Sequence, residues 1–167
     1  GVAARIVTAY GRAFHARGLG VILFDSHAAP PLVPPRLYEE IVLPPTAAVV
    51  SFFRRDLGAP LVPYIMGGDT GRLLDLILAT GTNNVLCDFK ADLSSFVSRL
   101  SGRPVLLRAN IDPRFLLSAS PAEIRARTRD VLAVGRRHPG FLLGTGILPY
   151  EVDPANVIAV RDALKEK

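Results

Sequence analysis

The sequence predicts an α/β fold in which parallel strands alternate with helices. Five short apolar runs, each bounded by polar residues or by Gly and Pro, are typical of buried parallel strands. Segments with apolar residues at the helical spacing of about 3.6 residues lie between these runs. The expected strands cover residues 21–24, 61–65, 85–87, 105–107 and 141–143. Successive strands start 20 to 40 residues apart, which is typical of βα units in a parallel α/β protein.

Six helices are expected around these strands, and their ends support the assignment. The helices cover residues 2–17, 35–57 with an interruption at Pro44 and Pro45, 70–80, 92–100, 121–134 and 154–165. Glycines able to adopt the left-handed conformation follow the first five, namely Gly18, Gly58, Gly81, Gly102 and Gly135. Residues 120–123, Ser-Pro-Ala-Glu, form a capping box, and Asp153 before Pro154 is a similar helix start.

Composition limits the class of protein. The chain has 167 residues, of which 49% are hydrophobic and 21% charged, with a net charge of +5. This composition excludes a disordered or fibrous protein, and the length fits a single domain over residues 1–167. The basic residues are scattered without interleaved aromatic residues, so we expect no nucleic-acid partner. We expect no membrane partner either, because no apolar run approaches the roughly 18 residues of a membrane helix. A single cysteine, Cys87, and the lack of a signal-peptide pattern indicate the cytoplasm.

Five strands leave two architectures open, an open sheet and part of a barrel. An eight-stranded barrel typically takes about 250 residues. The chain begins inside a helical pattern, with no strand before it and with Gly1 in place of an initiator Met. We therefore expect the sequence to be truncated.

Polar residues gather directly after the expected strands, where parallel α/β folds bind ligands. These residues are Asp25 to His27, Gly67 to Thr70, Asp88, Arg108 to Asp112 and Gly144 to Gly146. Structural roles are the alternative: Asp69 or Thr70 caps the next helix, Asp112 with Pro113 forms a turn, and the glycines serve the backbone.

The sequence argues against two other chemistries. Ser26 and His27 lie beside Asp25, but no nucleophile elbow surrounds them, which argues against a serine hydrolase. Three dispersed histidines and one cysteine argue against a zinc site. We expect Cys87 to be a buried strand thiol, and His15 and His138 to lie at the surface.

Four segments, taken in order, resemble the uroporphyrinogen decarboxylase family. They are Phe-Asp-Ser-His-Ala at 24–28, Leu-Tyr-Glu-Glu-Ile-Val-Leu-Pro at 37–44, Ala-Asn-Ile-Asp-Pro at 109–113 and Gly-Thr-Gly-Ile-Leu-Pro at 144–149. The resemblance covers nearly the whole chain. It implies a (β/α)8 TIM barrel, of which this chain supplies about five βα units as the C-terminal part.

The resemblance also implies an activity, the cofactor-free decarboxylation of tetrapyrrole acetate side chains. The family's catalytic aspartate and main arginines fall outside these residues, so the catalytic residues are unknown here. Ser26 matches the family's substrate-contacting serine. The residues expected to bind substrate are Ser26, His27, Tyr64, Asp69, Arg108, Asn110 and Thr145. We expect no metal or cofactor, and either a homodimer or completion by a missing N-terminal segment.

Two alternatives remain open. The related corrinoid and coenzyme M methyltransferases bind zinc through a His-x-Cys and a later Cys. Those positions read Tyr64, Met66 and Thr145 here, which are poor zinc ligands, although residues 67–70, Gly-Gly-Asp-Thr, resemble the methyltransferase segment. The other alternative is a non-catalytic barrel that binds a tetrapyrrole or corrinoid ligand.

Overall fold

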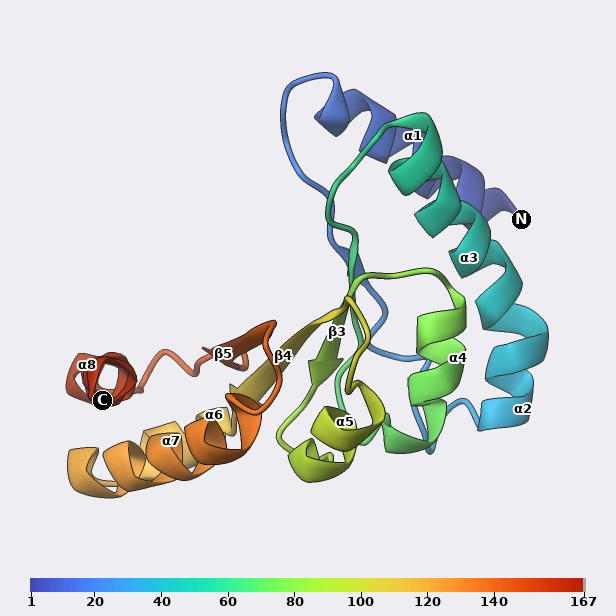
Figure 1. Ribbon diagram of the computed structural model, residues 1–167. Coiled ribbons are helices and arrows are strands. Elements are labelled where there is room, and N and C mark those ends of the chain that lie inside the picture. Colours follow the sequence, from blue (N-terminus) through green and yellow to red (C-terminus); the bar gives the residue numbers. More distant parts are fainter. Residues whose placement is uncertain (167) are drawn as a thin grey trace.

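The computed structural model describes residues 1–166 and contains one five-stranded sheet (Figure 1). Its strands are β1 (Leu23–Phe24), β2 (Pro63–Ile65), β3 (Asn84–Cys87), β4 (Leu106–Ile111) and β5 (Phe141–Thr145). The strands lie side by side in sequence order, and every neighbouring pair is parallel. The predicted α/β class is confirmed.

Helices occupy every connection between strands. α1 (Val2–His15) precedes β1, and α8 (Pro154–Lys165) follows β5. The helices between them are α2 (Pro35–Leu37), the π-helical turn η1 (Tyr38–Val42), α3 (Leu43–Ser51), the π-helical turn η2 (Phe52–Asp56), the 3-10 turn η3 (Gly71–Leu73), α4 (Leu74–Ala79), α5 (Leu93–Arg99), α6 (Pro113–Ser118) and α7 (Pro121–Gly135). No helix within residues 1–166 combines the length and the apolar character needed to cross a bilayer.

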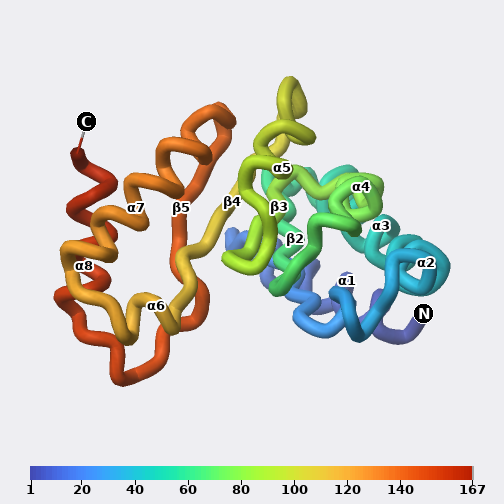
Figure 2. The backbone as a smooth tube through the Cα atoms, turned by 90° about the horizontal axis from the view of Figure 1, so that it is seen from below, coloured from blue at the N-terminus to red at the C-terminus, as the bar shows by residue number. Residues whose placement is uncertain are grey.

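The elements form an open arc whose two ends are α1 and α8. Figure 2 shows the N-terminus and the C-terminus at opposite ends of this arc. In a doubly wound sheet the strand order reverses at a switch point. Strands in unbroken sequence order, with their helices outside, are instead the arrangement of a (β/α)8 TIM barrel, and this chain forms a partial segment of one.

The main differences from the predictions concern β4, the helix over residues 35–56 and α6; in addition, β1 begins only at Leu23 and β5 extends to Thr145. β4 extends to Ile111 rather than ending at residue 107, so Arg108 and Asn110 lie within the strand. The helix over residues 35–56 is continuous through Pro44 and Pro45, because both prolines occupy the first turn of α3, where a missing N–H costs little. The π-helical turn before them makes a longer-range bond, from the Leu43 N–H to the Tyr38 carbonyl. α6 was not predicted at all.

Side-chain caps start four of the helices. Asp92, Asp112, Ser120 and Asp153 each accept a hydrogen bond from a backbone N–H in the first turn of α5, α6, α7 and α8. The predicted capping box of Ser120 and Glu123 is confirmed. Asp112 therefore acts as a helix cap rather than as a simple turn residue.

The hydrophobic core lies between the sheet and the helices. Its largest cluster packs Tyr64, Val85, Cys87 and Leu107 of the strands against α4, α5 and neighbouring helices. A second cluster joins Ile111 of β4 to α6, α7 and α8, and a third joins Phe53 and Val62 to α3. The three clusters thus lie on the helix side of the sheet, while β2 and β3 are buried along their whole length, Ile65 and Leu86 included.

Both ends of the arc expose apolar side chains, which we call the apolar flanks. On the first flank, Val2, Ile6, Tyr10 and Phe14 of α1 are exposed, together with Phe24 of β1. On the second, Ile158 and Leu164 of α8 are exposed. Contiguous exposed apolar surface marks a place where a soluble fold meets further protein.

Two predictions around the α7–β5 connection are wrong. His138 is buried rather than at the surface, and its Nε2 lies 2.7 Å from the Val105 carbonyl oxygen, which ties this loop to the start of β4. Gly135 is the last residue of α7 and lacks the left-handed conformation, which Gly18, Gly58, Gly81 and Gly102 do adopt. Gly135 is needed instead for close packing, because an added Cβ would overlap the Phe141 ring.

We predict that Gly135→Ala destabilises the complete protein by about 1–3 kcal/mol, the usual cost of overpacking. The Phe141 ring must move away from α7 to admit the new methyl group. The urea midpoint of unfolding measures the effect. Gly20→Ala is the matched control, since a Cβ at Gly20 meets no atom within 4 Å, and it should leave the midpoint unchanged. Equal midpoints for the two variants would contradict the packing role.

Candidate functional site

One face of the sheet packs against the helices. We call the opposite face the inner face. Along β4, Leu107, Ala109 and Ile111 are buried, whereas Arg108 and Asn110 are partly exposed. Because successive side chains of a strand point to opposite faces, Arg108 and Asn110 lie on the inner face. In the register of the sheet, Arg108 pairs with Leu86 on β3 and with Leu142 on β5.

A line of hydrogen bonds crosses the inner face near the carboxyl ends of the strands. Arg108 donates from Nη2 to the Thr145 carbonyl oxygen and from Nε to Asn110 Oδ1, each over 3.2 Å. Asn110 donates from Nδ2 to Asp88 Oδ1 over 3.4 Å. Asp88 Oδ2 accepts the Gly68 N–H over 2.9 Å. The line thus joins β5, β4 and β3 to the loop after β2.

Two glycines make this line possible. A Cβ at Gly144 would lie 3.0 Å from Nε and Nη2 of Arg108 and 3.2 Å from Asn110 Oδ1, so the guanidinium lies across β5 where no side chain intervenes. Gly68 has a φ of 86°, a left-handed conformation that side chains rarely adopt, while its N–H bonds to Asp88.

Arg108 forms no direct ion pair in the described part of the chain. None of the ion pairs within residues 1–166 includes it, and both of its hydrogen-bond partners are neutral. A guanidinium has five N–H donors, and these bonds use two. The remaining donors are free to bind an anionic group, and carboxylates suit the geometry of the guanidinium well.

A second group of polar side chains lies at the end of β1. Tyr38 donates to the Tyr64 hydroxyl, which donates to Asp25 Oδ2, with both oxygen–oxygen distances 3.2 Å. Burial raises the pKa of Tyr38 and that of Tyr64, so both hydroxyls keep their protons. Asp25 and Tyr64 also line a cavity of about 390 Å³ between α1, α3 and β1.

The structure distributes the predicted site residues unevenly. Arg108 and Asn110 are brought together on the inner face. Tyr64 belongs to the core on the helix side instead. Thr145 pairs with the buried Ile111, so its side chain also faces the helices and only its carbonyl reaches Arg108.

The remaining predicted residues lie on loops. Ser26 and His27 are exposed just after β1, and their side chains form no hydrogen bond within residues 1–166. Asp69 is exposed as well, and its Oδ1 accepts the Gly71 N–H over 3.1 Å, which is a local turn contact beside the helix start rather than the helix cap foreseen as its alternative.

Asp88 was expected among the polar residues after the strands, but the sequence predictions did not include it among the substrate-binding residues. It directly follows β3, and only 8% of its surface is exposed. Its position after a predicted strand was the one available signal, and a lone acid after a strand also fits a helix cap. Among residues 1–166, no group of three or more His, Cys, Asp and Glu side chains is placed to hold a metal ion.

Comparisons of the sequence with a family model and with known proteins point to the same family. A sequence model described as Uroporphyrinogen decarboxylase (URO-D) matches residues 1–167. The chain is similar to the uroporphyrinogen decarboxylase of Paraburkholderia phytofirmans, with 38% identity over 96% of this chain and 44% of that protein. It is 38% identical to the uroporphyrinogen decarboxylase of Paraburkholderia xenovorans, over 89% of this chain and 41% of that protein. It is 34% identical to that of Pseudomonas aeruginosa strain LESB58, over 98% of this chain and 46% of that protein. The chain spans less than half the length of these relatives.

We predict that Cys87 is inert to thiol reagents in the folded protein. Burial raises the pKa of the Cys87 thiol to about 12. The nearby carboxylates of Asp92, Asp88 and Asp69 add to this effect. An unperturbed thiol has a pKa near 8.5, so at pH 8 labelling of native Cys87 should be roughly a thousandfold slower than in urea. Peptide mapping after timed alkylation of the complete protein measures this rate. Similar rates in the native and unfolded protein would contradict the prediction.

Proposed function

The chain belongs to the uroporphyrinogen decarboxylase family, and on this premise we propose that it forms part of an enzyme that decarboxylates acetate side chains of a tetrapyrrole. The observation that carries the proposal is the unpaired guanidinium of Arg108 on the inner face. A substrate with several carboxylates supplies the direct ion-pair partner that Arg108 lacks within residues 1–166.

The surroundings of Arg108 suit an acidic substrate with an apolar body. Leu86 and Leu142 are its register neighbours on either side. Apolar side chains that exclude water lower the local dielectric, and a charge–charge attraction is stronger there than in bulk water. The ring system would lie against Leu142, which is exposed, while a carboxylate reaches the guanidinium.

We assign Arg108 to a carboxylate that the substrate retains. Loss of CO2 removes the charge of the reacting group, so a cation bound to that group would stabilise the substrate more than the transition state. Arg108 therefore orients the substrate by a side chain that does not react. Exposed Ser26 and His27 are available for further hydrogen bonds to carboxylates, and we place the catalytic groups outside this chain.

The assembly follows from the apolar flanks. We propose that residues 1–167 act as one domain within a complete barrel, in which further strands cover the free edges of β1 and β5. A homodimer is the other arrangement that would cover exposed apolar surface. We expect the protein in the cytoplasm, without a cofactor, and with neither nucleic acid nor a membrane as partner.

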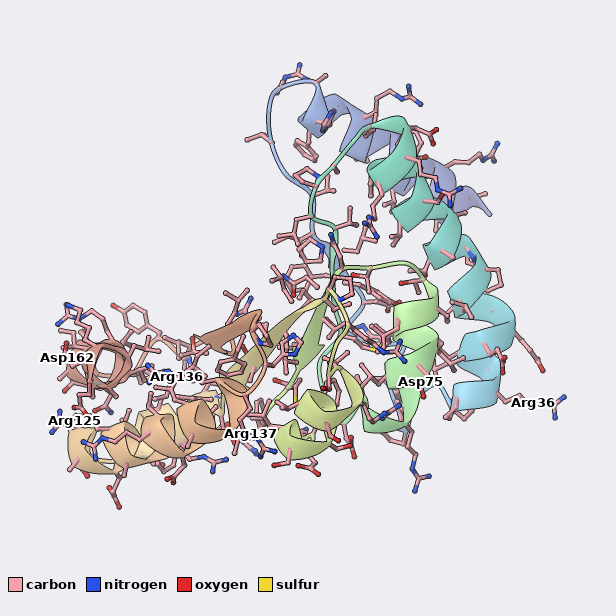
Figure 3. All side chains as sticks on the ribbon, viewed as in Figure 1. Arg36, Asp75, Arg125, Arg136, Arg137 and Asp162 are labelled. Carbon is pink, nitrogen blue, oxygen red and sulfur yellow. The ribbon has the colours of Figure 1, made fainter. Side chains whose placement is uncertain are left out.

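The direct test is an anaerobic assay of the complete protein with uroporphyrinogen, in which products with fewer carboxylates are separated after oxidation. We predict that Arg108→Gln lowers kcat/KM by about 10- to 100-fold, because a charged hydrogen bond is lost. Arg125→Gln is the matched control. Arg125 lies on α7 in the helical layer (Figure 3) and should be replaceable without loss.

Other outcomes would identify the alternatives. The relatives carry the decarboxylase name, which does not favour the methyltransferase alternative. Stoichiometric zinc with methyl transfer to a thiol would nevertheless overturn the decarboxylase proposal. Tetrapyrrole binding without turnover would indicate a non-catalytic binding protein.

A further inference from the structure

Opposite charges share the inner face without forming an ion pair. Arg108 and Asp88 both contact Asn110, and one amide group separates them. Asn110 is suited to this position because its amide accepts at one end and donates at the other. An acid at residue 110 would pair with Arg108 and repel Asp88, and an apolar residue would release both charges to approach each other.

Both charged groups are held in place yet retain binding capacity. The Gly68 N–H fixes Asp88 Oδ2, and the Thr145 carbonyl fixes the Arg108 guanidinium. A carboxylate offers about four acceptor positions, of which Asp88 uses two, and Arg108 uses two of its five donors. Preorganised groups with unused positions are what a ligand site requires.

We propose that Asn110 keeps Arg108 and Asp88 apart, so that the inner face binds a ligand presenting a carboxylate beside an N–H donor. Arg108 receives the carboxylate and Asp88 receives the N–H. A ligand with only one of these groups would leave the other charge unmatched. Asn110 is a positioning residue, because it acts through its two neighbours.

This inference rests on the proposed function and makes it more specific. A pyrrole ring with acidic side chains carries an N–H and carboxylates on one small, flat unit. The pair of charges would then recognise one ring of the substrate by two of its features at once. The exposed side chain of Leu142, the register neighbour of Arg108 on β5, would contact the ring carbons.

Three probes separate the two contacts in the complete protein. They are a monopyrrole with one acetate and one propionate side chain, its N-methyl derivative and its diamide. We expect N-methylation and amidation each to raise the dissociation constant of the native protein about tenfold or more, because each removes a hydrogen bond to a charged group. Isothermal titration or NMR titration measures the constants.

Variants then assign each loss to a residue. Asp88→Asn should reduce the effect of N-methylation several-fold and leave that of amidation unchanged. Asp75→Asn is its matched control, because Asp75 lies on α4 and is bonded to Arg99, away from the inner face (Figure 3). Asn110→Asp should abolish the effect of amidation, since the new carboxylate would form an ion pair with the Arg108 guanidinium in place of the probe's carboxylate. Ratios of dissociation constants are used because a general loss of packing would weaken all three probes alike.

The outcomes distinguish this inference from the proposed function. Equal affinity of the native protein for the parent and N-methyl probes would overturn the inference, as would an unchanged amidation effect in Asn110→Asp. If uroporphyrinogen is not decarboxylated while both probe effects hold, the decarboxylase proposal fails and the ligand assignment stands. Decarboxylation without either probe effect would overturn the inference alone.

Discussion

The alternation of side chains along β4 is the constraint on which the rest of the inner face depends. Leu107, Ala109 and Ile111 are buried beneath the helices, and this is possible only when Arg108 and Asn110 face the other way. A slip of one residue would place a guanidinium in the core and expose three apolar side chains. The hydrophobic core thereby fixes the register, and the register brings Arg108 beside β5 and Asn110 beside Asp88. Stability and ligand recognition thus depend on the same strand.

Helices and strands were predictable from the sequence where a single local pattern, such as an apolar run or a capping box, determines the element. Apolar runs predicted all five strands, and the capping box predicted the start of α7. The end of β4 was missed because Arg108 interrupts the apolar run, although the alternation continues to Ile111. α6 was missed because its six residues are too short for a helical period to be recognised. The prolines of α3 suggested a break, but whether a proline breaks a helix depends on its distance from the helix start.

The site was only partly predictable, because a residue's place after a strand does not reveal which face it joins. Arg108 and Asn110 were expected at this rim and lie together there. Tyr64 was expected beside them, yet its hydroxyl bonds to Tyr38 and Asp25 on the helix side. Asp88 gains its place through hydrogen bonds to Gly68 and Asn110, which are 20 and 22 residues away in sequence. Such partners become visible only once the register is known.

Pairing of each strand with its sequence neighbour also bears on how the chain folds. Every strand pair in the arc is closed by one βα connection, so the sheet requires no contact between the first and last strands described. Pairing across a single βα connection costs less loop-closure entropy than pairing the first strand with the last would. The arc can therefore grow one strand at a time while the polypeptide emerges from the ribosome. Each newly added strand would then serve as the template for the next, and the inner face would be assembled in the order in which its residues are synthesised.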